Sequence, residues 1–95
     1  MTVYVVAQMR FTDRSAYDRY AREFFAVFRE HEGTVLAAEE EPVVLEGTLE
    51  WEKVVLLSFP TGEALDDWAG SAAYRRISRD RHAGTQSCVI RLRGL

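Results

Sequence analysis

Cysteine is almost absent from this 95-residue sequence, and long apolar runs are absent altogether. With Cys88 as the only thiol, one chain cannot build a disulfide framework or a thiolate metal cluster. The position of Cys88 in an apolar strand pattern predicts a buried residue and not a nucleophile. No apolar run approaches the roughly 20 residues that a membrane helix requires, so we expect no membrane partner. Residues 1–6 lack the features of a signal peptide, and the expected location is the cytoplasm.

A strong excess of charge is also missing. The formal net charge of −3 gives no general attraction to nucleic acid or to anionic lipid. Arginines do cluster between residues 75 and 81, but Asp66, Asp67 and Asp80 dilute them, and no aromatic platform for bases accompanies them. We therefore expect no nucleic-acid partner. A glycine-rich phosphate loop and a Ser–His triad pattern are likewise absent.

What is present is an alternation of apolar and polar residues that is typical of one small globular domain, spanning residues 1–95. Apolar residues make up 47% of the chain, which is ordinary for a folded domain. Period-two patterns predict strands, and Asp13, Thr61 and Ser71 are candidate helix N-caps. The expected strands are 3–11, 34–38, 51–59 and 86–93, and the expected helices run from Asp13 to about His31, from Thr61 to Gly70, and over 72–83. This order predicts an α+β, ferredoxin-like split β-α-β-β-α-β domain with a four-stranded antiparallel sheet.

The strand patterns also predict two apolar sheet faces. We expect the helices to cover the fully apolar sets, namely Val3, Val5, Ala7, Met9 and Phe11; Val55, Leu57 and Phe59; and Cys88, Ile90 and Leu92. The opposite face would still carry Tyr4, Val6, Val54, Leu56 and Val89, with the polar members Gln8, Arg10, Ser58 and Arg91 at its interior or rim. An apolar patch of this size predicts a homodimer that closes into an α/β barrel. The alternative is a monomer whose sheet is half in water.

Several motifs together carry a family resemblance. They are the strand followed by Asp13-Arg14-Ser15-Ala16-Tyr17 and Tyr20, then Gly33, Val44-Leu45-Glu46-Gly47, and Val54 to Pro60 followed by Ala64, Trp68, Ser71, Tyr74 and Arg81. With these motifs the sequence resembles the domain-of-unknown-function 1330 family over nearly its whole length. The resemblance implies a dimeric α/β-barrel fold, in a superfamily that includes cofactor-independent monooxygenases, isomerases, haem-degrading enzymes and stress proteins. It implies no settled reaction. Members often have Trp where this sequence has Leu49, and Trp51 follows two residues later.

Four residues are the main candidates for a binding pocket between helices and sheet: Tyr20, Trp68, Tyr74 and Arg81. The aromatic groups can stack a ligand and offer one polar atom each, whereas core packing is the more common role of such residues. At about 100° per residue Arg81 falls on the apolar face of its helix, where its guanidinium can bind a carboxylate or enolate. The alternative for Arg81 is compensation of the helix dipole in the last turn.

Two further candidates are Glu46 and His82. Glu46 would act as a general base if an apolar pocket raised its pKa, whereas a solvated turn carboxylate is the alternative. His82 adjoins Arg81 near a helix C-terminus and is able to point toward the same pocket. The sequence has no His-x-x-x-His or Glu-x-x-His spacing, so we expect no metal and no cofactor.

Two functions remain open from the sequence. The first is a small cofactor-free enzyme or binder for an apolar or aromatic acid, of the monooxygenase or isomerase kind, with a cavity that touches the four pocket candidates. The second is a non-catalytic dimeric accessory or stress-related module, in which the same aromatic residues fill that space completely.

Overall fold

The computed structural model describes all 95 residues as four strands and three helices. The strands are β1 (Val3–Phe11), β2 (Thr34–Glu39), β3 (Lys53–Phe59) and β4 (Thr85–Arg93). The helices are α1 (Arg14–Phe28), α2 (Gly62–Ala69) and α3 (Ala72–Gly84). None of the three helices is long and apolar enough to span a membrane. The predicted order of elements is confirmed.

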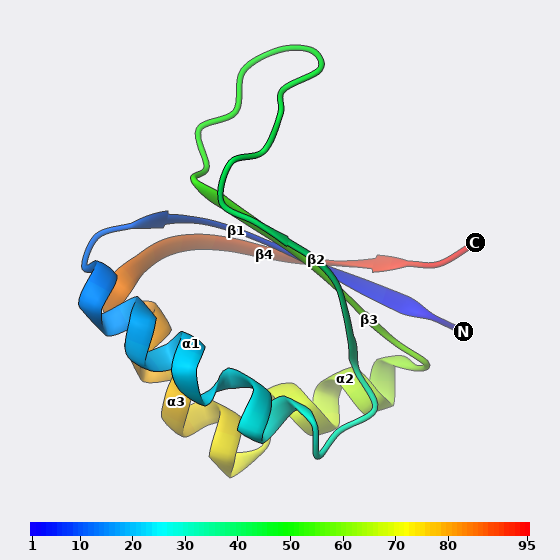
Figure 1. Cartoon of the computed structure of the whole chain (residues 1–95). Helices are drawn as coiled ribbons and strands as arrows, with labels where there is room; N and C mark the ends of the chain where they lie inside the picture. Colours follow the sequence, from blue (N-terminus) through cyan, green and yellow to red (C-terminus); the bar gives the residue numbers. More distant parts are fainter.

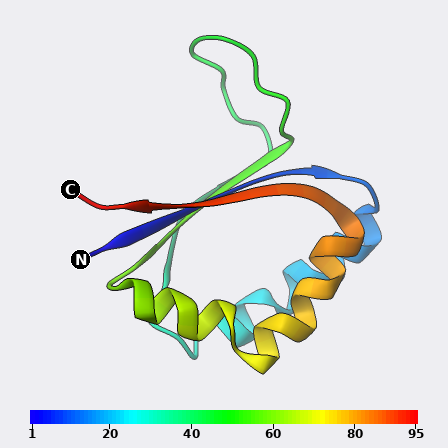
Figure 2. The ribbon, with the colours of Figure 1, turned by 180° about the vertical axis from the view of Figure 1, so that it is seen from behind.

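The strands form one antiparallel sheet in the order β2-β3-β1-β4. All three helices lie on one face of this sheet, and the opposite face has no covering element (Figures 1 and 2). This is the ferredoxin-like arrangement that the sequence predicts.

All three predicted N-caps are present. The Asp13 carboxylate accepts hydrogen bonds from the backbone amides of Ser15 and Ala16, and the Thr61 and Ser71 hydroxyls cap α2 and α3. The Ser15 hydroxyl and then the Ala16 amide hold the pKa of Asp13 below its ordinary value. Helix α1 ends at Phe28, before the predicted end at His31, because the following residues form a turn toward β2.

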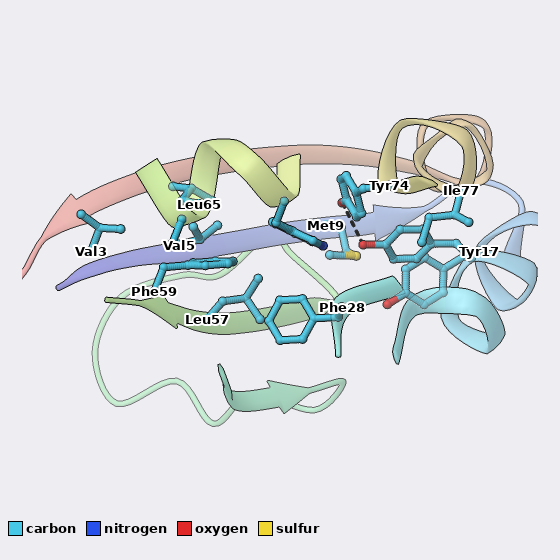
Figure 3. Close-up of a cluster of buried hydrophobic side chains, with 13 residues drawn as sticks. Val3, Val5, Met9, Tyr17, Phe28, Leu57, Phe59, Leu65, Tyr74 and Ile77 are labelled. Atoms are coloured by element: carbon cyan, nitrogen blue, oxygen red, sulfur yellow. Dashed lines mark hydrogen bonds between the residues drawn. The ribbon is translucent and has the colours of Figure 1, made fainter. Parts of the chain in front are cut away.

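The core lies between the helices and the inner, helix-facing side of the sheet. Val3, Val5 and Met9 of β1 and Leu57 and Phe59 of β3 are at most 5% exposed. Their side chains point toward the helices, as Figure 3 shows for this cluster. The predicted inner faces of β1 and β3 are therefore correct.

The predicted faces of β4 are wrong. Directly opposed residues of an antiparallel pair share a face, and Cys88, Ile90 and Leu92 oppose Gln8, Val6 and Tyr4. These three side chains therefore lie on the outer face, and Cys88 is exposed where a buried residue was predicted. The inner face of β4 instead carries Thr85, Ser87, Val89, Arg91 and Arg93.

The junction between α3 and β4 explains this inversion. The Gly84 carbonyl accepts hydrogen bonds from the amides of Thr12 and Asp13, and the Thr85 hydroxyl donates to the Arg81 carbonyl. These contacts fix Thr85 opposite Phe11 on the inner face. Because side chains alternate along a strand, one anchored residue sets the face of every residue after it.

The connection between β2 and β3, residues 40–52, projects as an arm away from the helix layer (Figures 1 and 2). Three consecutive apolar residues in it lie largely in water, because Val43, Val44 and Leu45 are 82%, 47% and 94% exposed. Gly47 has φ of 85°, a left-handed conformation that favours glycine. The Glu-Gly turn predicted at this point is thus part of a projecting loop.

Candidate functional site

A cavity of about 470 Å³ lies between the helix layer and the inner face of the sheet. Its size is within the range of small-molecule sites. Eighteen of its 22 lining residues are hydrophobic, so it suits a largely apolar ligand. The walls come from every helix and every strand, and they include Ala7 of β1, Val35 of β2, Val55 of β3 and Val89 of β4.

Trp68 of α2 is the central aromatic residue of this wall. Its ring stacks on Phe59 at 5.5 Å, meets Phe28 edge-on at 5.3 Å, and lies 4.1 Å from the Tyr74 ring. The side chain is buried, and its Nε1 has no hydrogen-bond partner. An unpaired buried donor costs roughly 1–3 kcal/mol, which an acceptor atom of a ligand can recover.

Tyr20 and Tyr74 form a second polar group in the cavity wall. Their hydroxyl oxygens lie 2.9 Å apart, drawn as a dashed line in Figure 3. One hydroxyl donates to the other, so the accepting hydroxyl keeps its own proton available. Burial, followed by the neighbouring Tyr74, raises the pKa of Tyr20 far above its ordinary value, and the Arg81 charge only partly offsets this. Tyr20 is consequently a hydrogen-bond donor, not a base, at neutral pH.

Four charged residues line the cavity: Lys53, Asp66, Arg81 and Arg91. Lys53 is held by the Glu40 carboxylate at 3.6 Å and lies 4.9 Å above the Tyr17 ring. Neither Arg81 nor Arg91 has a carboxylate within ion-pair distance. The lining therefore carries an excess of positive charge, which favours an anionic group on the ligand.

His82 lies beside this charge but does not line the cavity. One terminal nitrogen of Arg81 is 3.2 Å from His82 Nε2. Partial burial first, and then the Arg81 charge, lower the pKa of His82. A neutral imidazole accepts a hydrogen bond at Nε2, so His82 can orient the Arg81 guanidinium.

The structure brings together four of the six predicted site residues. Tyr20, Trp68, Tyr74 and Arg81 all line the cavity, and His82 contacts one of them. Glu46 is apart from them, exposed in the projecting arm. No three His, Cys, Asp or Glu side chains lie close enough together to hold a metal ion.

Sequence reasoning missed three charged cavity residues, Lys53, Asp66 and Arg91. Arg91 was assigned to the other face because the inward set of β4 was inverted. Thr85 could have indicated the correct face. Strand β4 begins directly after the last residue of α3, Gly84, so its first side chain faces the helix layer and the alternate residues after it do the same. Lys53 is opposite Met9 and so faces the helices, with its side chain only 14% exposed.

Comparison with known proteins places this fold in a family. The model of a domain of unknown function (DUF1330) matches residues 2–95. The chain belongs to the DUF1330 family. No match was found among curated proteins.

Solved structures support the ferredoxin-like fold of this DUF1330 protein. A protein of unknown function from Rhodopseudomonas palustris has a TM-score of 0.83 at 22% identity, covering 99% of this chain and 82% of that one. A dimeric ferredoxin-like protein from Jannaschia has a TM-score of 0.74 at 15% identity, covering 99% and 100%. SnoaB, a cofactor-independent oxygenase from Streptomyces nogalater, has a TM-score of 0.69 at 10% identity, covering 99% and 93%. Identities this low establish a shared fold alone.

Proposed function

We propose that this protein binds a small apolar or aromatic acid in the cavity and acts on it without a cofactor. The observation that carries the proposal is a largely hydrophobic cavity of about 470 Å³ that is lined by Trp68, whose buried Nε1 has no hydrogen-bond partner. A protein that only needed a filled core would have no use for an open space with an unpaired donor in its wall. The proposed reaction is of the cofactor-independent monooxygenase kind, with O₂ as oxidant, or of the isomerase kind. The fold shared with SnoaB supports this class.

The distribution of polar atoms defines the acid. Trp68 Nε1 and the free phenol proton of the Tyr20–Tyr74 pair offer hydrogen bonds to a carbonyl, enolate or carboxylate oxygen. Arg81 and Arg91 are the groups for a negative charge. The rest of the ligand contacts apolar and aromatic side chains, so a planar ring with one acidic group fits the lining best.

A thermal-shift screen of aromatic acids and keto acids tests binding, with the matching alcohols as controls. A ligand at about 100 times its Kd stabilises the native state by roughly 2.7 kcal/mol, which raises the melting temperature by several degrees. We expect acids to raise it and their alcohols to have less effect. If no acid does so, the binding proposal is wrong.

Two variants then locate the bound acid. Trp68→Phe keeps an aromatic ring but removes the Nε1 donor, and Arg81→Gln removes the charge. We expect each to weaken binding about tenfold or more, the equivalent of one charge-assisted or buried hydrogen bond. Arg75→Gln is the matched control, because Arg75 is an exposed residue of the same helix that does not line the cavity. Equal loss in Arg75→Gln would contradict the assigned site.

The second candidate function is the non-catalytic dimeric accessory module. It requires the aromatic residues to fill the space between helices and sheet, and the cavity disfavours it. This function would be favoured if no acid in the screen changed the melting temperature and the Trp68→Phe and Arg81→Gln variants were as stable as the wild type.

We also propose that the protein is a homodimer through the outer face of its sheet. The register gives this face Tyr4, Val6, Val54, Leu56, Ile90 and Leu92, the last two 44% and 48% exposed. This is a more apolar surface than the sequence pattern predicted, because β4 contributes Ile90 and Leu92 in place of Val89. The dimeric relative from Jannaschia supports the proposal. Sedimentation at micromolar concentration tests it, and a single mass near 10.9 kDa would refute it.

A further inference from the structure

The projecting arm has a fixed base and an unattached tip. At one leg, Glu40 forms ion pairs with Arg14 at 2.8 Å and Lys53 at 3.6 Å. At the other leg, Trp51 lies under the Arg10 guanidinium at 5.3 Å and the Glu52 carboxylate accepts a hydrogen bond from the Phe11 amide. These contacts at the base therefore fix the direction in which the arm leaves the domain.

The tip has no comparable support from its own chain. No backbone hydrogen bond joins residues 42–50 to any other residue. The same segment holds the exposed run of Val43, Val44 and Leu45. Ordering a residue costs roughly 1–2 kcal/mol, and apolar groups in water return nothing against that cost. The tip thus has the properties of a segment that is completed by a partner.

The outer face of the sheet is too small to form a standard interface by itself. Four strands spaced about 4.8 Å apart and some 25 Å long offer roughly 500 Å² of projected area, less than the ~800 Å² that each partner buries in a standard interface. An additional segment such as the arm would supply the missing area. Both the arm and this face lie on the side of the sheet away from the helices (Figures 1 and 2). A second copy on the outer face is therefore within reach of the arm.

The length of the arm matches as well. About six extended residues separate base from tip, roughly 20 Å, which is close to the width of a four-stranded sheet. Strand β4 is moreover an exposed edge from Gln86 onward, the kind of surface that proteins usually cover.

We infer that residues 40–52 are a dimerisation arm, which lies over the outer face of a second copy of this chain with Val43–Leu45 directed to its β4 edge. Each copy carries both the arm and the receiving surface, so a two-fold axis satisfies both contacts at once. The inference rests on the proposed homodimer and adds the segment that secures it. It also gives a cause for the exposed apolar run of the arm.

Shortening the arm is the first test. Residues 42–50 are replaced by Asn-Gly, a sequence suited to a tight hairpin turn, and the dimer dissociation constant is measured by sedimentation over a range of concentrations. We expect it to rise at least tenfold. The double variant Val43→Ser with Leu45→Ser leaves the loop length unchanged and should act in the same direction if the shortened chain does not fold. An unchanged constant in a dimeric protein overturns the arm and leaves the dimer standing. A monomeric wild-type protein overturns both.

Cross-linking through the native thiol is the second test. Cys88 is exposed on the outer face of β4, so it reports on that surface. A tagged Leu45→Cys, Cys88→Ser chain is mixed with untagged wild-type chain and treated with a short bifunctional thiol reagent. We expect a cross-link between tagged and untagged chains. Glu30→Cys, Cys88→Ser carries its cysteine in the exposed turn that follows α1 and is the control. Equal cross-linking from both positions, or none from Leu45→Cys in a dimeric sample, contradicts the inference.

Discussion

The hydroxyl oxygens of Tyr20 and Tyr74 lie 2.9 Å apart, although 54 residues separate them in the chain. This buried contact joins α1 to the helix that follows Trp68, and it forms part of the cavity wall. The pair therefore has two roles: it ties the helix layer together, and it supplies a free phenol proton to the cavity. Those roles respond differently to mutation.

A double-mutant cycle of Tyr20→Phe and Tyr74→Phe measures the first of these roles, the contribution of the contact to stability. Each single variant leaves one buried hydroxyl without a partner and should lower the free energy of unfolding by about 1–2 kcal/mol. The double variant removes both hydroxyls and should lose less than the sum, a coupling of about 1 kcal/mol. Urea denaturation measures these values. Strict additivity would show that the hydroxyl contact contributes nothing to stability.

Alkaline pH should destabilise the protein through Tyr20. The pKa of this phenol is raised in the folded state, so between pH 10 and the folded value the unfolded chain loses a proton that the folded chain keeps. Stability is thus complete below about pH 10 and falls above it, by at most about 1.4 kcal/mol per pH unit.

Tyr20→Phe tests this pH dependence. The variant should have a shallower loss of stability between pH 10 and 11.5 than the wild type, measured by urea denaturation at each pH. Tyr4→Phe is the control, because Tyr4 is on the outer face of the sheet, away from the Tyr20–Tyr74 pair. Equal slopes in wild type and Tyr20→Phe would contradict the assignment.

Local sequence signals predicted most of this fold because they depend on short-range physics. Asp13, Thr61 and Ser71 cap helices through contacts within three residues. The apolar alternation from Val3 to Phe11 identifies the face of β1 that the helices cover. The faces of β4 were not predictable in this way. Ile90 and Leu92 are as apolar as core residues, but they cover a different surface, and alternation alone does not tell which apolar face meets the helices.

The candidate site follows the same division. Helical spacing placed Tyr74 and Arg81 on one face, and the structure brings both to the cavity. Arg91 depends on the register of β4, and Glu46 depends on the path of a 13-residue connection, so neither position follows from local periodicity. Long connections without helix or strand are the part of a chain that sequence reasoning places least well.

Gly84 is the position where a single methyl group should destabilise the fold most clearly. A Cβ there would lie 2.6 Å from the Asp13 carbonyl oxygen and 2.7 Å from the Tyr17 amide nitrogen, both backbone atoms of α1 and its cap. Gly84→Ala must separate α3 from α1, and we expect a loss of about 1–3 kcal/mol, seen as a fall in melting temperature of roughly 5–20 °C.

Gly62→Ala is the matched control for that prediction. A Cβ at Gly62 would meet only the flexible end of Arg91 at 3.4 Å, and alanine favours the first turn of α2. We expect an unchanged or slightly raised melting temperature. Comparable losses in the two variants would show that close backbone approach at Gly84 is not the cause.

A charge at the centre of the outer face tests the dimer interface directly. Leu56 opposes Val6 in the register and is next to Ala37 of the edge strand β2, so a two-fold arrangement brings its side chain against the second sheet. Leu56→Glu buries an unpaired carboxylate there at a cost of roughly 3 kcal/mol, which raises the dimer dissociation constant about a hundredfold. Ala26→Glu adds the same charge to an exposed position on α1 and should leave the constant unchanged. Sedimentation of both variants, with circular dichroism to confirm the fold, decides the matter: a Leu56→Glu dimer as tight as the Ala26→Glu dimer would mean that the copies associate through some other surface.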